Sequence, residues 1–264
     1  MTLRAVLFDV GDTLLEHWAG PERTIELAVP VLRREFGDRE WYGRLLTAEL
    51  GPNKRGHAAK GSHLVPNDDA LRQETLRWYE EWFANSSIGI DDIDLDRLRV
   101  ACTVPLDLVS ELVPGAAQAL RWSKARDLRV ILVTNTLSRG EAQVWEDWRR
   151  FGLADAIDGI VTSHDTGWQK PHRRMFERAL ELARTSAAEA VMVGDRTDAD
   201  IIGAKRLGMR AVLRRTTNPG AMDDVGVAPD AIIDDLTELP GVLSAWLEVP
   251  NAHGPLRRQS AEGR

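Results

Sequence analysis

The sequence predicts an α/β fold in which a parallel sheet, covered by helices on both faces, carries an inserted α-helical domain. Short apolar runs rich in Val and Ile alternate with helical patterns over the second half of the chain, which is typical of a parallel sheet with crossover helices. Between the first such run and residue 113, by contrast, the patterns are helical and no convincing strand occurs.

Six apolar runs are expected to form the sheet. They show little alternation of apolar and polar residues, as expected for strands that are buried on both faces. The expected strands are 3–9, 129–134, 157–162, 190–194, 210–214 and 230–233. Because helical patterns separate most of them, the strands should be parallel and joined by right-handed crossovers.

The helices are recognised by apolar residues that recur three and four positions apart. In the helix expected at 172–184, Met175, Phe176 and Ala179 fall on one side. Gly208 ends the helix expected at 199–207. The remaining helices are expected at 116–126 and 140–151, and in the insertion at 21–36, 40–50, 68–85 and 94–98.

These elements divide the chain into two domains and a tail. We expect residues 1–15 and 113–250 to form the sheet-bearing core, and residues 16–112 to form a small helical domain over it. Residues 51–63 indicate a long Gly-rich, basic loop within this helical domain. Residues 251–264 are expected to be a frayed tail.

The composition excludes several classes of partner. The 264 residues carry a formal charge of −7, so neither nucleic acid nor an anionic membrane is an expected partner. No apolar run approaches the ~20 residues that span a bilayer. The single cysteine, Cys102, cannot form an internal disulfide, and no secretion signal precedes the first strand, so we expect a cytoplasmic protein. The oligomeric state stays open between monomer and homodimer.

Carboxylates stand at the ends of two expected strands. Asp9 ends the first apolar run, Asp195 ends the run at 190–194, and Asp200 follows shortly afterwards. Parallel sheets bind ligands at the carboxyl ends of their strands, where connections diverge. A carboxylate there can be a nucleophile, a metal ligand or both. This pattern indicates covalent chemistry on a phosphate.

Four motifs, in order, resemble those of the haloacid dehalogenase superfamily, in particular its members with a helical cap inserted after the first motif. The motifs are Asp9-Val10-Gly11-Asp12-Thr13, Val130 to Thr136, Gly167 to His172, and Val193 to Ile201. The resemblance covers nearly the whole chain. It implies a Rossmann-like core, a helical cap, and hydrolysis of a small phosphorylated substrate.

The resemblance also implies roles for residues of the first three motifs. Asp9 would attack phosphorus and form an aspartyl phosphate. Thr134 and Lys170 would hold the transferring phosphoryl group, and Asn135 would help to bind the substrate through its side-chain amide.

Mg²⁺ is the implied cofactor, because oxygen ligands and a phosphate substrate select this ion. Its ligands would be Asp9, the backbone carbonyl of Gly11, Asp195 and Asp200. We expect Asp198, in the same motif as Asp195, to cap the following helix instead.

Gly11 departs from the family pattern. Phosphatases of this family usually carry a second aspartate at this position, which protonates the leaving group, and such a proton transfer is worth ~10²–10⁴ in rate. Asp12 is the nearest acid, and the pattern fits equally well a replacement acid and a residue that tolerates a left-handed turn. A substrate with a good leaving group, or a phosphate-binding protein with weak catalysis, would also explain Gly11.

The same departure leaves two other family reactions open, 2-haloacid dehalogenation and phosphonate cleavage. Dehalogenation is less favoured, because Gly194-Asp195 with Asp200 is the metal-binding version of the fourth motif. Phosphonate cleavage needs a lysine in the cap that forms a Schiff base. Lys54 and Lys60 are the candidates, but both stand in the basic loop, where a solvated charge is the simpler interpretation.

Overall fold

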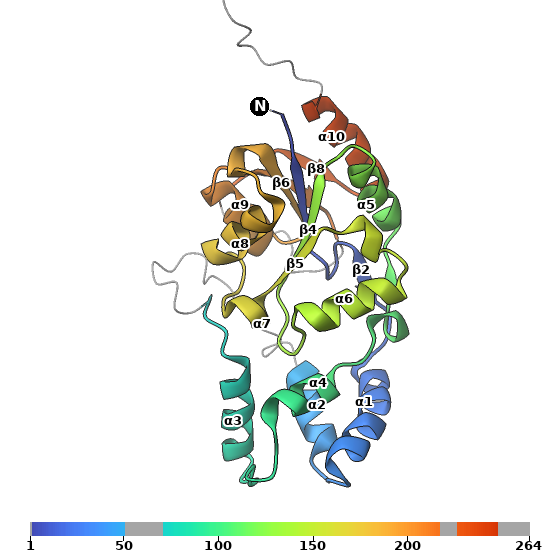
Figure 1. Ribbon diagram of the computed structural model, residues 1–264, viewed down its shortest axis with the longest axis vertical. Helices are drawn as coiled ribbons and strands as arrows, with labels where there is room; N and C mark the ends of the chain where they lie inside the picture. Colours follow the sequence, from blue (N-terminus) through green and yellow to red (C-terminus); the bar gives the residue numbers. More distant parts are fainter. Residues whose placement is uncertain (1, 51–70, 217–225, 248–264) are drawn as a thin grey trace, which may run out of the picture.

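The computed structural model of the protein describes residues 2–50, 71–216 and 226–247 (Figure 1). Six strands form one parallel sheet in the order β5-β4-β1-β6-β7-β8. Every expected strand is present, with the predicted bounds or slightly shorter ones. The bounds are β1 Ala5–Phe8, β4 Arg129–Thr134, β5 Gly159–Thr162, β6 Ala190–Gly194, β7 Arg210–Arg214 and β8 Ala231–Ile233.

Strand β1 lies in the middle of this sheet. It pairs with β4 on one side and with β6 on the other. The later strands are therefore added on both sides of β1. The carboxyl ends of β1, β4 and β6 lie next to one another. This is the topological switch point at which α/β sheets bind ligands.

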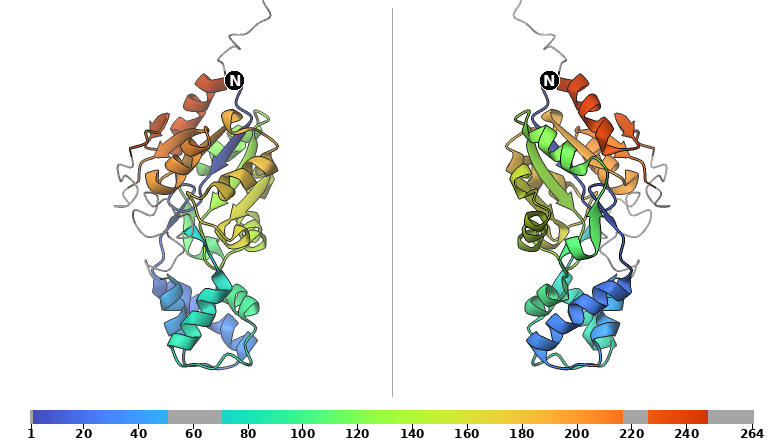
Figure 2. Two further views of the ribbon diagram at one scale, coloured as in Figure 1. Left: turned by 90° about the vertical axis from the view of Figure 1, so that its left-hand side faces the viewer. Right: turned by 90° about the vertical axis from the view of Figure 1, so that its right-hand side faces the viewer.

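Helices cover both faces of the sheet (Figures 1 and 2). Helices α8 and α9 pack on one face, and α5 and α10 on the other. The side chains of β1 alternate accordingly, because Ala5 and Leu7 join the first layer while Val6 and Phe8 join the second. The core helices are α5 Ala116–Lys124, α6 Glu141–Arg150, α7 Ser163–Thr166, α8 Arg173–Ala183, α9 Ile202–Arg206 and α10 Leu239–Leu247.

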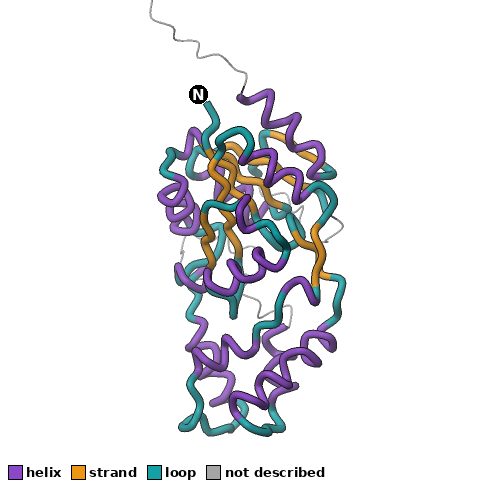
Figure 3. The backbone as a smooth tube through the Cα atoms, turned by 45° about the vertical axis from the view of Figure 1, so that its right-hand side comes forward, coloured by secondary structure: helices purple, strands orange, loops and turns teal. Residues whose placement is uncertain are grey.

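Four helices of the segment between β2 and β3 gather beyond the carboxyl ends of the strands, apart from the sheet (Figures 1 and 3). We call them the helical insertion; they are α1 Pro21–Phe36, α2 Tyr42–Leu50, α3 Thr75–Asn85 and α4 Leu95–Cys102. The buried side chains of Tyr42, Tyr79 and Phe83 belong to their core. Helix α3 begins later and α4 ends later than the sequence predicts. The basic loop expected at 51–63, with Lys54 and Lys60, lies outside the described residues, as does the tail expected at 251–264.

Several elements of the structure were not predicted, and two of them are longer-range features of the fold. Strands β2 (Leu15–His17) and β3 (Ser110–Leu112) form an antiparallel pair through which the chain enters and leaves the helical insertion. Helix α10 was also missed, because Pro240 and Gly241 stand in its first turn and favour a loop interpretation. Across the described ranges, none of the helices combines the length and the apolar character needed to cross a membrane.

Short helical turns complete the core. They are the 3-10 turns Leu106–Leu108, Ala154–Ala156, Ala187–Glu189 and Leu236–Glu238, and the π-helical turn Thr197–Ile201.

Candidate active site

The end of β1 fixes the position of Asp9. The Asp9 backbone N–H donates to the Val193 carbonyl at 2.9 Å, so the pairing of β1 with β6 extends by one residue. The Val10 carbonyl then accepts the N–H groups of Leu14 and Leu15, both at 2.9 Å, which closes a tight turn. Asp9 is 8% exposed. Sheet pairing on one side and the turn on the other therefore hold its carboxylate at the buried edge of the sheet.

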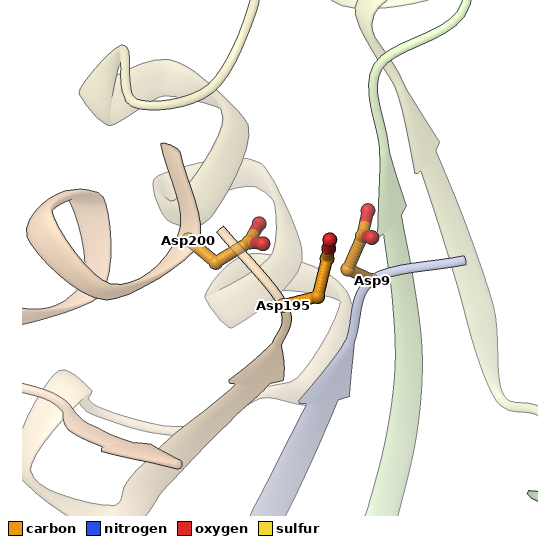
Figure 4. Close-up of side chains that lie close together, drawn as sticks. All are labelled: Asp9, Asp195 and Asp200. Carbon is orange, nitrogen blue, oxygen red and sulfur yellow. The ribbon is translucent and has the colours of Figure 1, made fainter. Parts of the chain in front are cut away.

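Two further carboxylates meet Asp9 from β6 and from the turn after it. Asp195 directly follows β6, and Asp200 lies in the π-helical turn, where its Oδ2 accepts the Arg196 N–H at 3.1 Å. Gly194 permits this arrangement, because a Cβ at that position would stand 2.4 Å from Asp200 Cγ. Carboxylate oxygens of Asp9, Asp195 and Asp200 all lie within 4.8 Å of one another (Figure 4).

Lys170 is the cation of this cluster. Its Nζ donates to Asp9 Oδ1 and, at 2.7 Å, to the Val133 carbonyl, and it lies 2.7 Å from Asp200 Oδ1. The Lys170 backbone is held by Asn135, whose Oδ1 accepts the Lys170 N–H at 2.8 Å and whose Nδ2 donates to the Lys170 carbonyl at 3.3 Å. In this structure Asn135 positions Lys170. A direct contact of the Asn135 amide with substrate stays a prediction.

The carboxylates outnumber the cations here. Burial, and then the charges of Asp9 and Asp200, raise the pKa of Asp195. Burial also raises the pKa of Asp200, although the neighbouring Lys170 ammonium opposes this. Burial lowers the pKa of Lys170, but Asp200 and Asp9 outweigh it and the net shift is upward. Three ionised carboxylates beside one ammonium repel one another in a dry site.

A divalent cation fits this set of donors. Asp9, Asp195 and Asp200 are all buried and offer only oxygen atoms, the ligand type preferred by Mg²⁺. One such ion would compensate the negative charge that Lys170 leaves unbalanced. The cluster can therefore hold a metal.

Thr13 is a member of the site for which no role was predicted from the sequence. Its hydroxyl is fully buried, 3.2 Å from Asp9 Oδ2 and 3.3 Å from Asp195 Oδ1. It fixes the orientation of both carboxylates. Its place in the first motif, four residues after Asp9, was the available signal.

The turn between Asp9 and Thr13 shows the backbone conformation of Asp12. Asp12 has a φ of 54°, in the left-handed region that Asp tolerates, and its carbonyl accepts Arg214 Nη1 at 2.6 Å. The conformational expectation for Asp12 is therefore confirmed. Asp12 also lines the cavity of the site, and its charge helps to raise the pKa of Asp195. A role in proton transfer stays a prediction.

The expectation for Asp198 was wrong. Asp198 lies inside the π-helical turn and does not cap it; both of its oxygens accept the Arg196 guanidinium, at 2.8 and 2.6 Å. The turn winds more loosely than an α-helix, so the helix proper begins only at Ile202. The same turn brings Asp200 back over Gly194.

A cavity of about 330 Å³ opens over the cluster. The core supplies one wall, including Asp9, Gly11, Thr134, Lys170 and Asp195. The helical insertion supplies the other, including Thr24, Leu46, Glu49, Cys102 and Thr103. No sequence motif marked this second wall, because its residues come from α1, α2 and the end of α4 and are not contiguous along the chain.

Hydrogen bonds tie the insertion to the core beside this cavity. The Gln73 side chain donates to the Thr136 carbonyl at 2.7 Å, and the Thr75 hydroxyl donates to the Leu137 carbonyl at 3.0 Å. The Gln73 N–H donates to the Gly167 carbonyl at 2.8 Å. Gln73 and the first residue of α3 thus contact the loop that follows Thr134 and the loop that carries Lys170.

The chain matches known proteins over most of its length. It is 26% identical over 245 residues to a glyceraldehyde 3-phosphate phosphatase of Pyrococcus furiosus, which covers 91% of this chain and 93% of that protein. It is 31% identical over 212 residues to a glyceraldehyde 3-phosphate phosphatase of Methanocaldococcus jannaschii, which covers 80% and 84%.

Among solved structures, a 2-haloacid dehalogenase from Pseudomonas syringae superposes with a TM-score of 0.55 and 26% identity, over 93% of this chain and all of that chain (100%). The model of one protein family, described as haloacid dehalogenase-like hydrolase, matches residues 3–208. With the carboxylate cluster at the switch point of a parallel sheet, this match shows that the chain is an enzyme of the haloacid dehalogenase-like hydrolase family.

Proposed function

We propose that the protein is a Mg²⁺-dependent phosphatase that hydrolyses a small phosphomonoester through an aspartyl phosphate on Asp9. The single observation that carries the proposal is the contact of the buried Asp9 carboxylate with Lys170, beside Asp195 and Asp200. A cation next to the nucleophile lets an anionic phosphate approach a carboxylate. The two relatives named as phosphatases support the same reaction class.

The proposal gives each of the two expected domains a role. Residues 1–15 and 113–250 would form the catalytic core, and residues 16–112 a cap that closes over the substrate. The cavity is lined from both parts, which supports a cap that touches the substrate. Its volume of about 330 Å³ lies near the lower end for small-molecule sites, so the substrate is small.

In the first step, an Asp9 oxygen forms a bond to phosphorus while the bond from phosphorus to the ester oxygen breaks. The Lys170 ammonium offsets the charge that Asp9 and the phosphoryl oxygens bring together. Thr134, at the end of β4, holds a phosphoryl oxygen with its hydroxyl. Thr13 keeps Asp9 oriented toward phosphorus.

In the second step, water attacks phosphorus, the bond between phosphorus and Asp9 breaks, and the carboxylate and inorganic phosphate are released. Asp9, Asp195, Asp200 and the Gly11 carbonyl would hold Mg²⁺. When bound, the ion supplies positive charge that offsets the phosphate dianion.

Proton delivery to the leaving oxygen falls to Asp12 or to water. Asp12 lines the cavity, whereas Gly11 offers no side chain. If Asp12 is the acid, Asp12→Asn slows an alkyl phosphate, whose leaving group needs a proton, more than an aryl phosphate, whose leaving group does not. Equal losses of rate on the two esters would indicate that water, and not Asp12, donates the proton to the leaving group.

The experiment that tests the proposal is hydrolysis of p-nitrophenyl phosphate with and without Mg²⁺, by the wild type and by Asp9→Asn. We expect turnover that needs both the metal and Asp9, with a loss of at least ~10³-fold in the variant. Mass spectrometry of the acid-quenched enzyme should find one phosphoryl group on the peptide that contains Asp9.

Three results would contradict the proposed phosphatase. Turnover that persists in Asp9→Asn would contradict a covalent intermediate on this residue. Halide release from a 2-haloacid without added metal would instead identify a dehalogenase, the activity named for the Pseudomonas syringae structure. Binding of phosphate without turnover of any ester would identify a phosphate-binding protein.

A further inference from the structure

The cavity wall contributed by the helical insertion contains a buried carboxyl group that the proposed mechanism does not use. Glu49 stands in the last turn of α2 and is 7% exposed. Carboxylates are rarely buried to this extent unless a partner satisfies them. Glu49 also lines the cavity that Asp9 and Lys170 line from the opposite side.

Only part of this carboxyl group is satisfied within the protein. Glu49 Oε1 accepts the Tyr79 hydroxyl of α3 at 3.1 Å. Glu49 Oε2 has no hydrogen-bond partner among the residues that the structure describes. A buried acceptor without a partner is costly, and a ligand group that donates a hydrogen bond would remove that cost.

The surroundings restrict what this ligand group can be. Leu46, Leu106 and Val109 add apolar surface to the lining of this cavity, which disfavours a charged group without a counterion. Arg139 also lines the cavity, but its guanidinium donates to Asp147 at 2.7 Å and to the Val104 carbonyl, so Asp147 already compensates its charge. A carboxylate at this place would face Glu49 and find no unpaired cation in the described wall.

We propose that Glu49 selects phosphomonoesters whose leaving group ends in a hydroxyl, which donates a hydrogen bond to Glu49 Oε2. The phosphoryl group lies at Asp9 and Lys170, and the hydroxyl at the far end of the leaving group reaches Glu49 across the cavity. Esters that end in a methyl leave Oε2 unsatisfied, and esters that end in a carboxylate are repelled. This inference rests on the proposed function and names its substrate class.

A matched series of esters tests the inference. Propyl phosphate, 3-hydroxypropyl phosphate and 2-carboxyethyl phosphate share a three-carbon chain and differ in the end group. With the Mg²⁺-loaded wild type at a pH of about 8.5, where Glu49 is ionised, we expect kcat/KM for the hydroxyl ester to exceed that for the propyl ester by about 10- to 100-fold. The carboxylate ester should be the poorest of the three.

Two variants locate the preference. Glu49→Leu removes both the acceptor and the charge, so the ratio between the hydroxyl and propyl esters should fall to about one. Glu49→Gln keeps an acceptor and removes the charge, so the carboxylate ester should gain relative to the other two. The matched control is Glu40→Gln, which changes an exposed glutamate of the insertion and should keep the wild-type ratios.

Each outcome decides between the two proposals. Equal kcat/KM for the three esters in the wild type overturns the role of Glu49 and leaves the phosphatase intact. A wild-type ratio that survives in Glu49→Leu overturns it as well. If Glu49→Leu does not fold, the wild-type series and Glu49→Gln decide. Failure to hydrolyse all three esters and p-nitrophenyl phosphate contradicts the proposed function itself, and the inference with it.

Discussion

The two walls of the cavity differ in how completely their charged groups are paired. On the core wall, Asp9 and Asp200 both contact Lys170, and Thr13 bridges Asp9 to Asp195. On the wall of the helical insertion, Tyr79 donates to one oxygen of Glu49, and the other oxygen has no hydrogen-bond partner among the described residues. The charges of the core wall are largely compensated within the protein, whereas the insertion wall leaves one carboxylate oxygen for which we propose a hydrogen bond from the substrate.

Removing the cation of the core wall should have the largest effect. Lys170→Met leaves Asp9 and Asp200 without their ammonium, so a phosphate dianion meets uncompensated carboxylates. We expect kcat/KM for p-nitrophenyl phosphate to fall on the order of 10³-fold. Lys170→Arg is the matched control for charge. It should recover little, because a planar guanidinium does not fit the place of a fully buried ammonium. Activity near the wild type in Lys170→Met would contradict the arrangement.

Removing the charge of Glu49 should change how stability depends on pH. Burial raises the pKa of Glu49 from its ordinary value of 4.5 to about 7, although Tyr79, Cys102, Arg139 and Arg99 lower it in part. The folded protein therefore holds a proton on Glu49 between these values that the unfolded chain releases. The free energy of unfolding falls as pH rises through this window, by about 3 kcal/mol for this group.

In Glu49→Gln, the free energy of unfolding should not show this part of the fall with rising pH. Urea unfolding at several pH values from about 5 to about 8 measures it, as the difference between the two proteins. The exposed variant Glu40→Gln should follow the wild-type curve. Parallel curves for the wild type and Glu49→Gln would mean that the pKa of Glu49 is close to its ordinary value.

Adding an acid at Gly11 should complete the core wall. A Cβ at Gly11 would have no other atom within 4 Å, so a side chain fits there. We expect Gly11→Asp to raise kcat on an alkyl phosphate by about 10²-fold, and to change an aryl phosphate little, since that leaving group needs no proton. Gly11→Asn has the same shape without the proton and serves as the control. A similar gain in both variants would point to the turn geometry instead of acid catalysis.

The smallest change removes the hydrogen bond that Tyr79 donates to Glu49. Tyr79→Phe removes the hydroxyl that donates to Glu49 Oε1 and leaves the aromatic ring in place. The carboxylate can then turn, so we expect the preference for a hydroxyl ester to weaken by a few-fold, or about 1 kcal/mol. A competitive assay with the hydroxyl and propyl esters in one mixture measures this ratio directly. An unchanged ratio would show that Tyr79 does not orient Glu49.

The core wall could be predicted from the sequence because each of its parts follows a buried strand within a short segment. Asp9, Thr134 and Asp195 stand at the ends of β1, β4 and β6, and the parallel sheet alone brings these ends together. The existence of the strands and of the helical insertion was predicted from their apolar patterns, whereas the order of the strands comes from the structure. Their apolar periodicity is long enough to separate strand from helix.

The insertion wall could not be predicted in this way. Glu49, Tyr79 and Cys102 come from α2, α3 and α4, and their meeting depends on how these helices pack. A glutamate in a helix is usually solvated, so nothing in the local sequence marks Glu49 as buried. Strands β2 and β3 escaped prediction because three residues give no measurable alternation. Asp198 was misassigned because a π-helical turn has the same sequence signals as a helix start.

The pairing of β2 with β3 has a mechanical consequence. The two connections between the core and the helical insertion are hydrogen-bonded to each other along their length, from Leu15 opposite Leu112 to His17 opposite Ser110. Two separate linkers would let the insertion twist and slide, whereas a bonded ribbon bends mainly across its flat face. The insertion would therefore move relative to the core mainly by a hinge rotation about one axis. A swing away from the core would break the hydrogen bonds of Gln73 and Thr75 to the Thr136 and Leu137 carbonyls.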